Sequence, residues 1–165
     1  MVEQHAASEA EKETARKATE EKRQADEREL VRIHADNIEK CLTSVVEPVL
    51  AEGINQLNGM YRAALKSGRT NDPRLHSKQT IIEIDIEVEG KHRHRGGASA
   101  QYRLEYAGDV DRGTITGMED FDGVRSTFID SHQMAIIDVT TERIEGHLRK
   151  FVEDFLKQDS GPHPS

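Results

Sequence analysis

The chain has 165 residues and a formal net charge of -8 at pH 7, with 33% charged and 4% aromatic residues. This length suits one ordinary domain with an appendage. The acidic balance disfavours nucleic acid as a partner, because attraction to a phosphate backbone depends on clustered Lys and Arg. No apolar run reaches the roughly 20 residues that a bilayer span requires, so we expect no membrane segment.

The chain has a single cysteine, Cys41, which excludes an internal disulfide. Its first ten residues lack the basic and apolar regions of a secretory signal peptide. We therefore expect a reducing, cytoplasmic location. Because Cys41 lies among helix-periodic apolar residues, we interpret it as buried filler rather than as a reactive thiol.

Residues 1–29 are dominated by Glu, Lys, Arg and Gln, and alanines are the only non-polar residues after Val2. Helix propensity is high, and charge pairs at helical spacing, such as Glu13 with Lys17, each add a few tenths of a kcal/mol. The heptad positions that face Ala18 and Ala25 are charged, so no coiled-coil seam is continuous. We expect a polar helical stalk that frays, or a disordered arm.

The segment Leu30–Leu65 carries apolar residues at alternating steps of three and four, which predicts a long buried helix. Pro48 interrupts it, at a cost of about 3 kcal/mol in a helix interior. We therefore expect a kink near the proline, and the capping-box spacing of Ser44 and Glu47 is suited to a helix restart there. Gly68 is the expected C-terminal cap.

Beyond Gly68 the pattern changes to strands. Aliphatic and acidic residues alternate through Thr80–Glu89, which predicts a strand with one face in the core and one in water. A second strand is expected through Tyr102–Tyr106, joined to the first by the hairpin loop Gly90–Gly97. Three further strands are predicted at Arg112–Glu119, Val124–Ile129 and Met134–Val139.

The last predicted element is an amphipathic helix from about Thr141 to Gln158, whose apolar face covers the sheet. Residues 159–165 are expected to form a disordered tail. The predicted fold class is α+β, with a long kinked N-terminal helix, an antiparallel meander of four or five strands and this C-terminal helix packed on the sheet. Residues 30–158 are expected to form its single domain.

A basic cluster stands at the predicted tip of the first hairpin in this otherwise acidic chain. A flexible, cationic tip can grip an acidic partner surface, and the alternative is a solvated loop that pairs with acidic residues of the same chain. We predict that the cluster binds a partner. It consists of Lys91, His92, Arg93, His94 and Arg95.

Signatures of catalysis and metal binding are weak. His92 and His94 project to one side if the strand continues through them, but a third ligand of recognised spacing is missing. Asp130, Ser131 and His132 have the residue types of a triad, yet consecutive residues in a turn point apart. We assign no catalytic residue, no metal site and no cofactor, and we favour a non-enzymatic protein.

The two amphipathic helices together offer more apolar surface than one small sheet face needs. We therefore expect part of that surface to meet a second copy in a homodimer. The residues predicted for this oligomer interface are Ile38, Leu42, Val49, Leu57 and Met60.

These observations suggest a non-enzymatic interaction or adaptor protein. It self-associates through its helices and presents the basic hairpin tip and the acidic face of Thr80–Glu89 to a protein partner. The alternative is a small-ligand carrier or enzyme with a pocket between sheet and helices. A third possibility is contact of the hairpin with RNA or DNA. The residues expected to line a pocket are Tyr102, Tyr106, Phe128 and Phe155.

Overall fold

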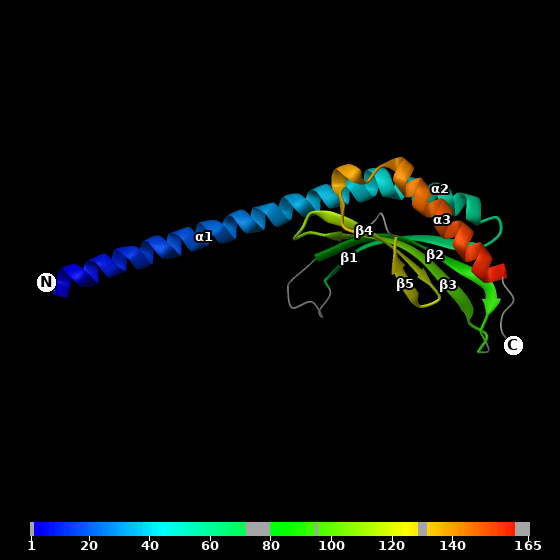
Figure 1. Cartoon of the computed structure of the whole chain (residues 1–165), viewed down its shortest axis with the longest axis horizontal. Helices are drawn as coiled ribbons and strands as arrows, with labels where there is room; N and C mark the ends of the chain where they lie inside the picture. The colour runs from blue at the N-terminus through cyan, green and yellow to red at the C-terminus, as the bar shows by residue number, and fades with distance from the viewer. Residues whose placement is uncertain (1, 72–79, 95, 129–131, 161–165) are drawn as a thin grey trace.

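The computed structural model describes residues 2–71, 80–94, 96–128 and 132–160 (Figure 1). In chain order the elements are α1 (Val2–Cys41), a π-helical turn (Leu42–Val46), α2 (Glu47–Leu57), β1 (Arg62–Asn71), β2 (Thr80–Arg93), β3 (Ser99–Asp109), β4 (Thr114–Phe121), β5 (Val124–Thr127), β6 (Met134–Ala135), a 3-10 turn (Ile136–Asp138) and α3 (Thr141–Ser160).

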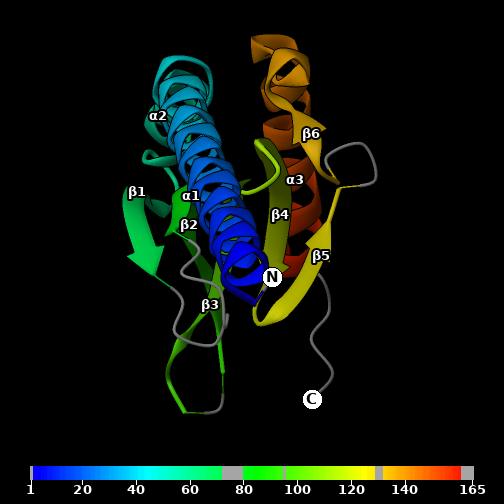
Figure 2. The same cartoon turned by 90° about the vertical axis from the view of Figure 1, so that its left-hand side faces the viewer.

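The strands form one antiparallel sheet in the order β1-β2-β3-β4-β5, and the short β6 pairs with the far end of β4. Helices α2 and α3 lie side by side over one face of this sheet, and the opposite face is open (Figures 1 and 2). The predicted α+β fold class is confirmed, with the antiparallel meander and the covering C-terminal helix in their expected places.

The core lies between the sheet and the helices because the aliphatic residues at alternate positions of β2, from Ile82 to Val88, point to the same side. Ile84, Ile86 and Val88 are buried there, together with Phe151 and Phe155 from α3. Full burial of a large apolar side chain contributes about 1.5–3 kcal/mol, so this layer supplies most of the cohesion of the domain.

Helix α1 runs from the domain far into solvent (Figure 1), and residues 9–29 have exposed side chains throughout. In the structure this segment is helical, and Arg23 forms ion pairs with Glu20 and Glu27 along it. Contact with the core begins near Val31, and Ile38 is fully buried. Within the described part of the chain, none of the helices has the length and hydropathy that a membrane crossing requires.

The kink expected near Pro48 takes the form of the π-helical turn, in which the N–H of Glu47 bonds to the C=O of Leu42. A proline lacks the N–H that would continue an α-helical ladder, and the wider turn places it within the first turn of α2. The predicted capping box does not form, because the Ser44 hydroxyl donates to the C=O of Lys40 instead.

The prediction that the helix continues to Leu65 is wrong. Helix α2 ends at Leu57, and β1 begins at Arg62. The Asn58 side chain accepts a hydrogen bond from the N–H of Ala63 at 3.1 Å, which supports the turn between the two elements. Gly68 is therefore a strand residue paired with β2, and not a helix cap. Pairing with a neighbouring strand outweighs the helix-like spacing of the side chains.

Two other boundaries differ from prediction. The segment Met134–Val139 is a strand only at its first two residues and then forms the 3-10 turn. Helix α3 continues through Ser160, two residues into the predicted tail, and residues 161–165 lie outside the described part of the chain.

Replacement of one β2 residue on each face tests this layer arrangement. Ile84 is buried against the helices and Glu83 lies on the open face. Ile84→Asp buries an unpaired charge, so we expect a loss of more than about 4 kcal/mol in the free energy of unfolding. Glu83→Lys should cost less than about 1 kcal/mol. Urea unfolding followed by circular dichroism measures both, and equal losses would contradict the strand register.

Candidate partner-binding site beside the first hairpin

The last turn of α3 anchors the end of β2 next to the first hairpin. The Asp159 carboxylate accepts hydrogen bonds from the backbone N–H groups of Lys91 at 3.0 Å and His92 at 3.1 Å. Gly90 leaves room for this contact, because a Cβ atom there would lie 2.6 Å from Asp159 Oδ1. A carboxylate opposes the dipole at a helix C-terminus, so these hydrogen bonds explain its placement there.

Two tyrosines pack around the same carboxylate. The Tyr102 hydroxyl donates to Asp159 Oδ1 at 3.4 Å, and burial together with the Asp159 charge raises the pKa of Tyr102 to about 12. The Tyr61 ring meets the Phe155 ring edge-on at 5.1 Å, and burial followed by Asp159 raises the pKa of Tyr61. The Tyr102 hydroxyl thus adds a third contact to the carboxylate that holds the hairpin backbone.

An open concavity of about 550 Å³ lies above this anchor, between the α2–β1 turn and the hairpin. We call it the basic hollow, because three cationic side chains meet there. Its lining residues are Asn58, Gly59, Met60, Tyr61, Arg62, Glu89, Gly90, Lys91, Arg93 and Ser99.

Two of the three cations in the basic hollow form weak ion pairs, or none, with other described residues. Arg93 has no ion pair with any residue in the described part of the chain. The Arg62 side chain is 89% exposed and approaches Glu89 only to 3.9 Å. The Lys91 ammonium lies 4.9 Å above the centre of the Tyr61 ring, a cation–π contact that holds it over the concavity. Glu89 is the one carboxylate in the lining, against three cations, so the hollow presents a net positive charge.

The structure separates the predicted hairpin cluster into two parts. Lys91 and Arg93 line the basic hollow. The rings of His92 and His94 meet edge-on at 5.7 Å, and His94 Nε2 lies 2.8 Å from the Asp122 carboxylate. Arg95 lies outside the described residues. Partner binding by these five residues stays a prediction.

Sequence reasoning missed most of the other residues of the hollow, among them Asn58, Tyr61 and Arg62. Asn58 and Tyr61 lie in the turn after α2 and Arg62 begins β1, in a segment whose spacing predicted helix. They approach Lys91 and Arg93 only because β1 pairs with β2, which aligns Arg62 with Glu89. The one available signal was the Asn58 and Gly59 pair, which is typical of a turn.

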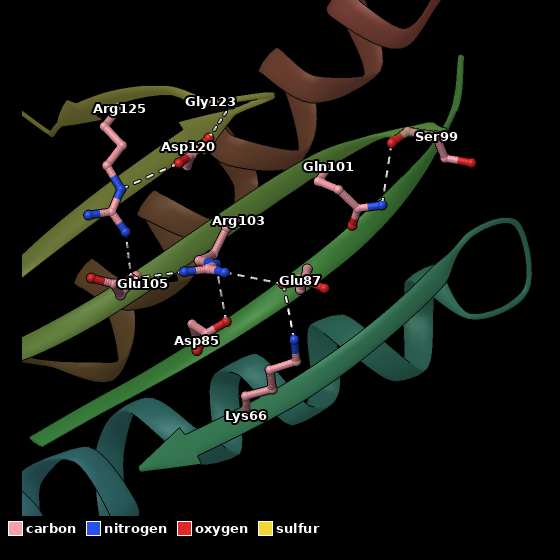
Figure 3. A network of polar contacts seen from close by, with 10 residues as sticks. All are labelled: Lys66, Asp85, Glu87, Ser99, Gln101, Arg103, Glu105, Asp120, Gly123 and Arg125. Carbon is pink, nitrogen blue, oxygen red and sulfur yellow. Dashed lines mark hydrogen bonds and ion pairs between the residues drawn. The ribbon is translucent and has the colours of Figure 1, made fainter. Parts of the chain in front are cut away.

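The acidic face of β2 is an internally paired network (Figure 3). The Arg103 guanidinium of β3 lies 3.6 Å from Asp85, 3.3 Å from Glu87 and 3.6 Å from Glu105. Lys66 of β1 extends the network through Glu87 at 3.1 Å. Arg125 of β5 extends it on the other side, 3.3 Å from Glu105 and 3.4 Å from Asp120.

Much of the negative charge on this face is therefore compensated within the chain. Asp85 is only 6% exposed, although the alternation predicted that the acidic side chains of β2 face water, and Glu105 on the neighbouring β3 is equally buried. Burial raises the pKa of Asp85 to about 6, against the opposing effect of Arg103. A hydrogen bond from Lys66 lowers the pKa of Glu87. This face therefore holds neighbouring strands together, and its presentation to a partner stays a prediction.

The residues predicted for the oligomer interface lie in two places. Ile38 and Leu42 are buried within the chain's own core, and Ile38 packs against the sheet at Gly108. Val49, Leu57 and Met60 line a groove of about 430 Å³ between α2 and α3, but only Met60 among them is largely exposed, at 63%. Gly53 permits the close approach of the helices, since a Cβ there would lie 2.6 Å from Leu148. Self-association through these residues stays a prediction.

The space expected for a ligand pocket is filled by side chains. Tyr102, Tyr106 and Phe155 are all buried. The Phe128 ring stacks on His147 with 4.5 Å between ring centres, and the Tyr106 hydroxyl lies 2.9 Å from His147 Nδ1. Aromatic rings thus occupy the region between sheet and helices that the carrier alternative requires to be open.

Metal and triad candidates gain no support from the described residues. No group of three or more His, Cys, Asp or Glu side chains within them is arranged to hold a metal ion. Asp130 and Ser131 lie outside the described residues. Comparison of the chain with protein-family models, curated proteins and solved structures finds no match.

The Asp85 carboxyl should make stability depend on pH. Because its pKa is raised from 3.8 to about 6, the folded chain retains a proton that the unfolded chain releases between these values. Stability therefore falls as the pH rises through this window. We expect Asp85→Asn to raise the free energy of unfolding at pH 7.5, by on the order of 2 kcal/mol, and to flatten this fall.

Glu87→Gln is the matched control, because the pKa of Glu87 is lowered and its carboxyl therefore makes stability rise, rather than fall, with pH. It should reduce stability at pH 7.5 and lose its effect as the pH falls through the pKa of the carboxyl. Urea titrations of both variants at pH 4 and 7.5 measure the difference. A destabilised Asp85→Asn at pH 7.5 would contradict the unfavourable burial of this charge.

Proposed function

We propose that the chain is a non-enzymatic interaction protein that binds an acidic segment of a partner protein in the basic hollow. The observation that carries the proposal is the convergence of Arg62, Lys91 and Arg93 around one open concavity in a chain of net charge -8. Guanidinium groups match carboxylates in geometry as well as charge, because their N–H donors can form two parallel hydrogen bonds.

Preorganisation supports the same function. The backbone of Lys91 and His92 is held by Asp159, and the Lys91 ammonium by Tyr61. A partner that enters the hollow therefore orders few main-chain torsions, which reduces the entropic cost of association. The carrier alternative is weaker, since the rings of Tyr102, Tyr106 and Phe155 fill the sheet–helix interior.

Self-association is the second part of the proposal, with a second copy contacting the groove between α2 and α3. The supporting observation is the set of apolar residues that line this groove together with charged residues of both helices, with Met60 63% exposed. Exposed apolar surface rimmed by polar residues is a common feature of interfaces between chains. In such a dimer the helices of the two copies would form one layer, and the exposed part of each α1 would extend from it.

A defined acidic probe tests the basic hollow. We expect fluorescein-labelled decaglutamate to bind the full chain, and binding to weaken as salt rises from about 0.05 to 0.5 M. The double variant Lys91→Glu with Arg93→Glu should bind at least tenfold more weakly in fluorescence anisotropy, because two cations of the hollow become anions. Both side chains are exposed, so the fold should persist.

The matched control is Arg16→Glu with Lys17→Glu, an equal change of charge on the exposed stalk. It should leave binding within about twofold, since these charges lie more than a Debye length from the hollow. Equal losses in both double variants would contradict a local site. Tighter binding of a single-stranded DNA decamer than of decaglutamate would favour the nucleic-acid alternative instead.

Light scattering coupled to size exclusion tests self-association. We expect the full chain to elute with the mass of a dimer and Met60→Glu to shift it toward the monomer, because a charge enters the apolar groove. Ile137→Glu is the control, since Ile137 is equally apolar and highly exposed but lies outside the groove. A wild-type monomer at about 100 µM would contradict this part of the proposal.

A further inference from the structure

Strand β1 forms an edge of the sheet. It pairs with β2 over all ten of its residues, and within the part of the chain that the structure describes no strand lies on its other side. An edge strand of this length has a row of main-chain donors and acceptors that can pair with an added strand.

One hydrogen bond identifies which backbone groups point outward. The N–H of Ala63 bonds to the Asn58 side chain rather than to β2. Successive residues of an antiparallel strand direct their main-chain groups alternately to the two sides. Because the β1–β2 register is unbroken, the N–H and C=O groups of Leu65 and Ser67 also point outward, and no described residue pairs with them.

The chemistry of β1 indicates what this edge accepts. Its inner side already pairs with β2, in which aliphatic and acidic residues alternate. On the open face, Arg62 and Lys66 are opposite Glu89 and Asp85, and both cations keep exposed side chains. On the helix side, Leu65 is half-buried at the margin of the core. A strand of the same alternation would meet cations on one face and apolar surface on the other.

We propose that the acidic partner segment binds as an added β-strand along the outer edge of β1, with acidic side chains beside Arg62 and Lys66 and aliphatic side chains beside Leu65. This inference rests on the proposed function and specifies its binding mode. Arg62 connects the two surfaces, because it begins β1 and also lines the basic hollow. The end of the added strand therefore reaches the hollow.

A second copy is a poorer occupant of this edge. Two β1 strands that pair with each other bring the Arg62 and Lys66 rows of both copies onto one face, and like charges on adjacent strands repel. Lysine on an edge strand is a common means by which sheets avoid pairing with themselves. An acidic strand instead relieves this charge.

The test uses a labelled peptide with the sequence of residues 80–89, TIIEIDIEVE, and the full chain. We expect the peptide to bind in fluorescence anisotropy and to slow amide hydrogen exchange at least tenfold at Leu65 and Ser67, whose outward N–H groups it engages. A peptide with lysine in place of every acidic residue should bind at least tenfold more weakly.

Two changes, one in the chain and one in the peptide, remove the strand contact without removing charge. Ser67→Pro deletes an outward N–H that β2 does not use, so we expect at least tenfold weaker peptide binding, whereas Ser67→Val keeps the donor and should bind normally. Should the proline variant fail to fold, a peptide N-methylated at alternate residues makes the same test on the wild-type chain. Decaglutamate, which lacks an aliphatic face, should keep its affinity for the Ser67→Pro variant.

The outcomes separate the two proposals. Peptide binding without slowed exchange at Leu65 and Ser67 would overturn strand addition and leave the basic hollow as the site. If the wild-type chain binds neither decaglutamate nor the peptide, the basic hollow and the strand addition are both overturned. Slow exchange at Leu65 and Ser67 that appears in the free chain as its concentration rises would assign the edge to a second copy and overturn the inference.

Discussion

Coverage of the sheet on one face only is the constraint on which the rest of the structure depends. The aliphatic positions of β2, among them Ile84 and Ile86, are buried under α2 and α3. The intervening positions must then carry polar side chains, and neighbouring strands are only about 4.8 Å apart. Carboxylates on adjacent strands are therefore crowded together, and the Arg103 guanidinium at their centre is what makes this density tolerable.

The same constraint determines where charge is available for a partner. On the open face, cations and carboxylates satisfy one another across the strands, so the face contributes mainly to cohesion (Figure 3). At the margin of the sheet this mutual pairing ends. Arg62 and Arg93 lie there, beside a hairpin whose backbone is held by Asp159. This net positive charge at one margin distinguishes the margin from the open face, where nearby carboxylates pair with the cations.

Local sequence pattern predicted the elements whose environment is uniform along their length. Within the predicted strand Thr80–Glu89, the residues from Ile82 onward alternate strictly because one side is core and the other is not, and α3 keeps one apolar face against the sheet. The pattern failed at β1, because Ala64 and Leu65 continue the helical spacing of the preceding segment and only the pairing with β2 makes them part of a strand. Lys91 and Arg93 follow a correctly predicted strand and were found from sequence. Arg62 lies in the segment predicted as helix and was not.

The two helices that cover the sheet come from opposite sides of it in the chain, α2 before β1 and α3 after β6. During synthesis the ribosome therefore completes every strand before it makes the helix that carries Phe151 and Phe155. Until α3 emerges, α2 covers only part of the apolar face of the nascent sheet. The nascent chain therefore exposes apolar surface until α3 has left the exit tunnel, and at this stage it is prone to aggregate and to bind chaperones.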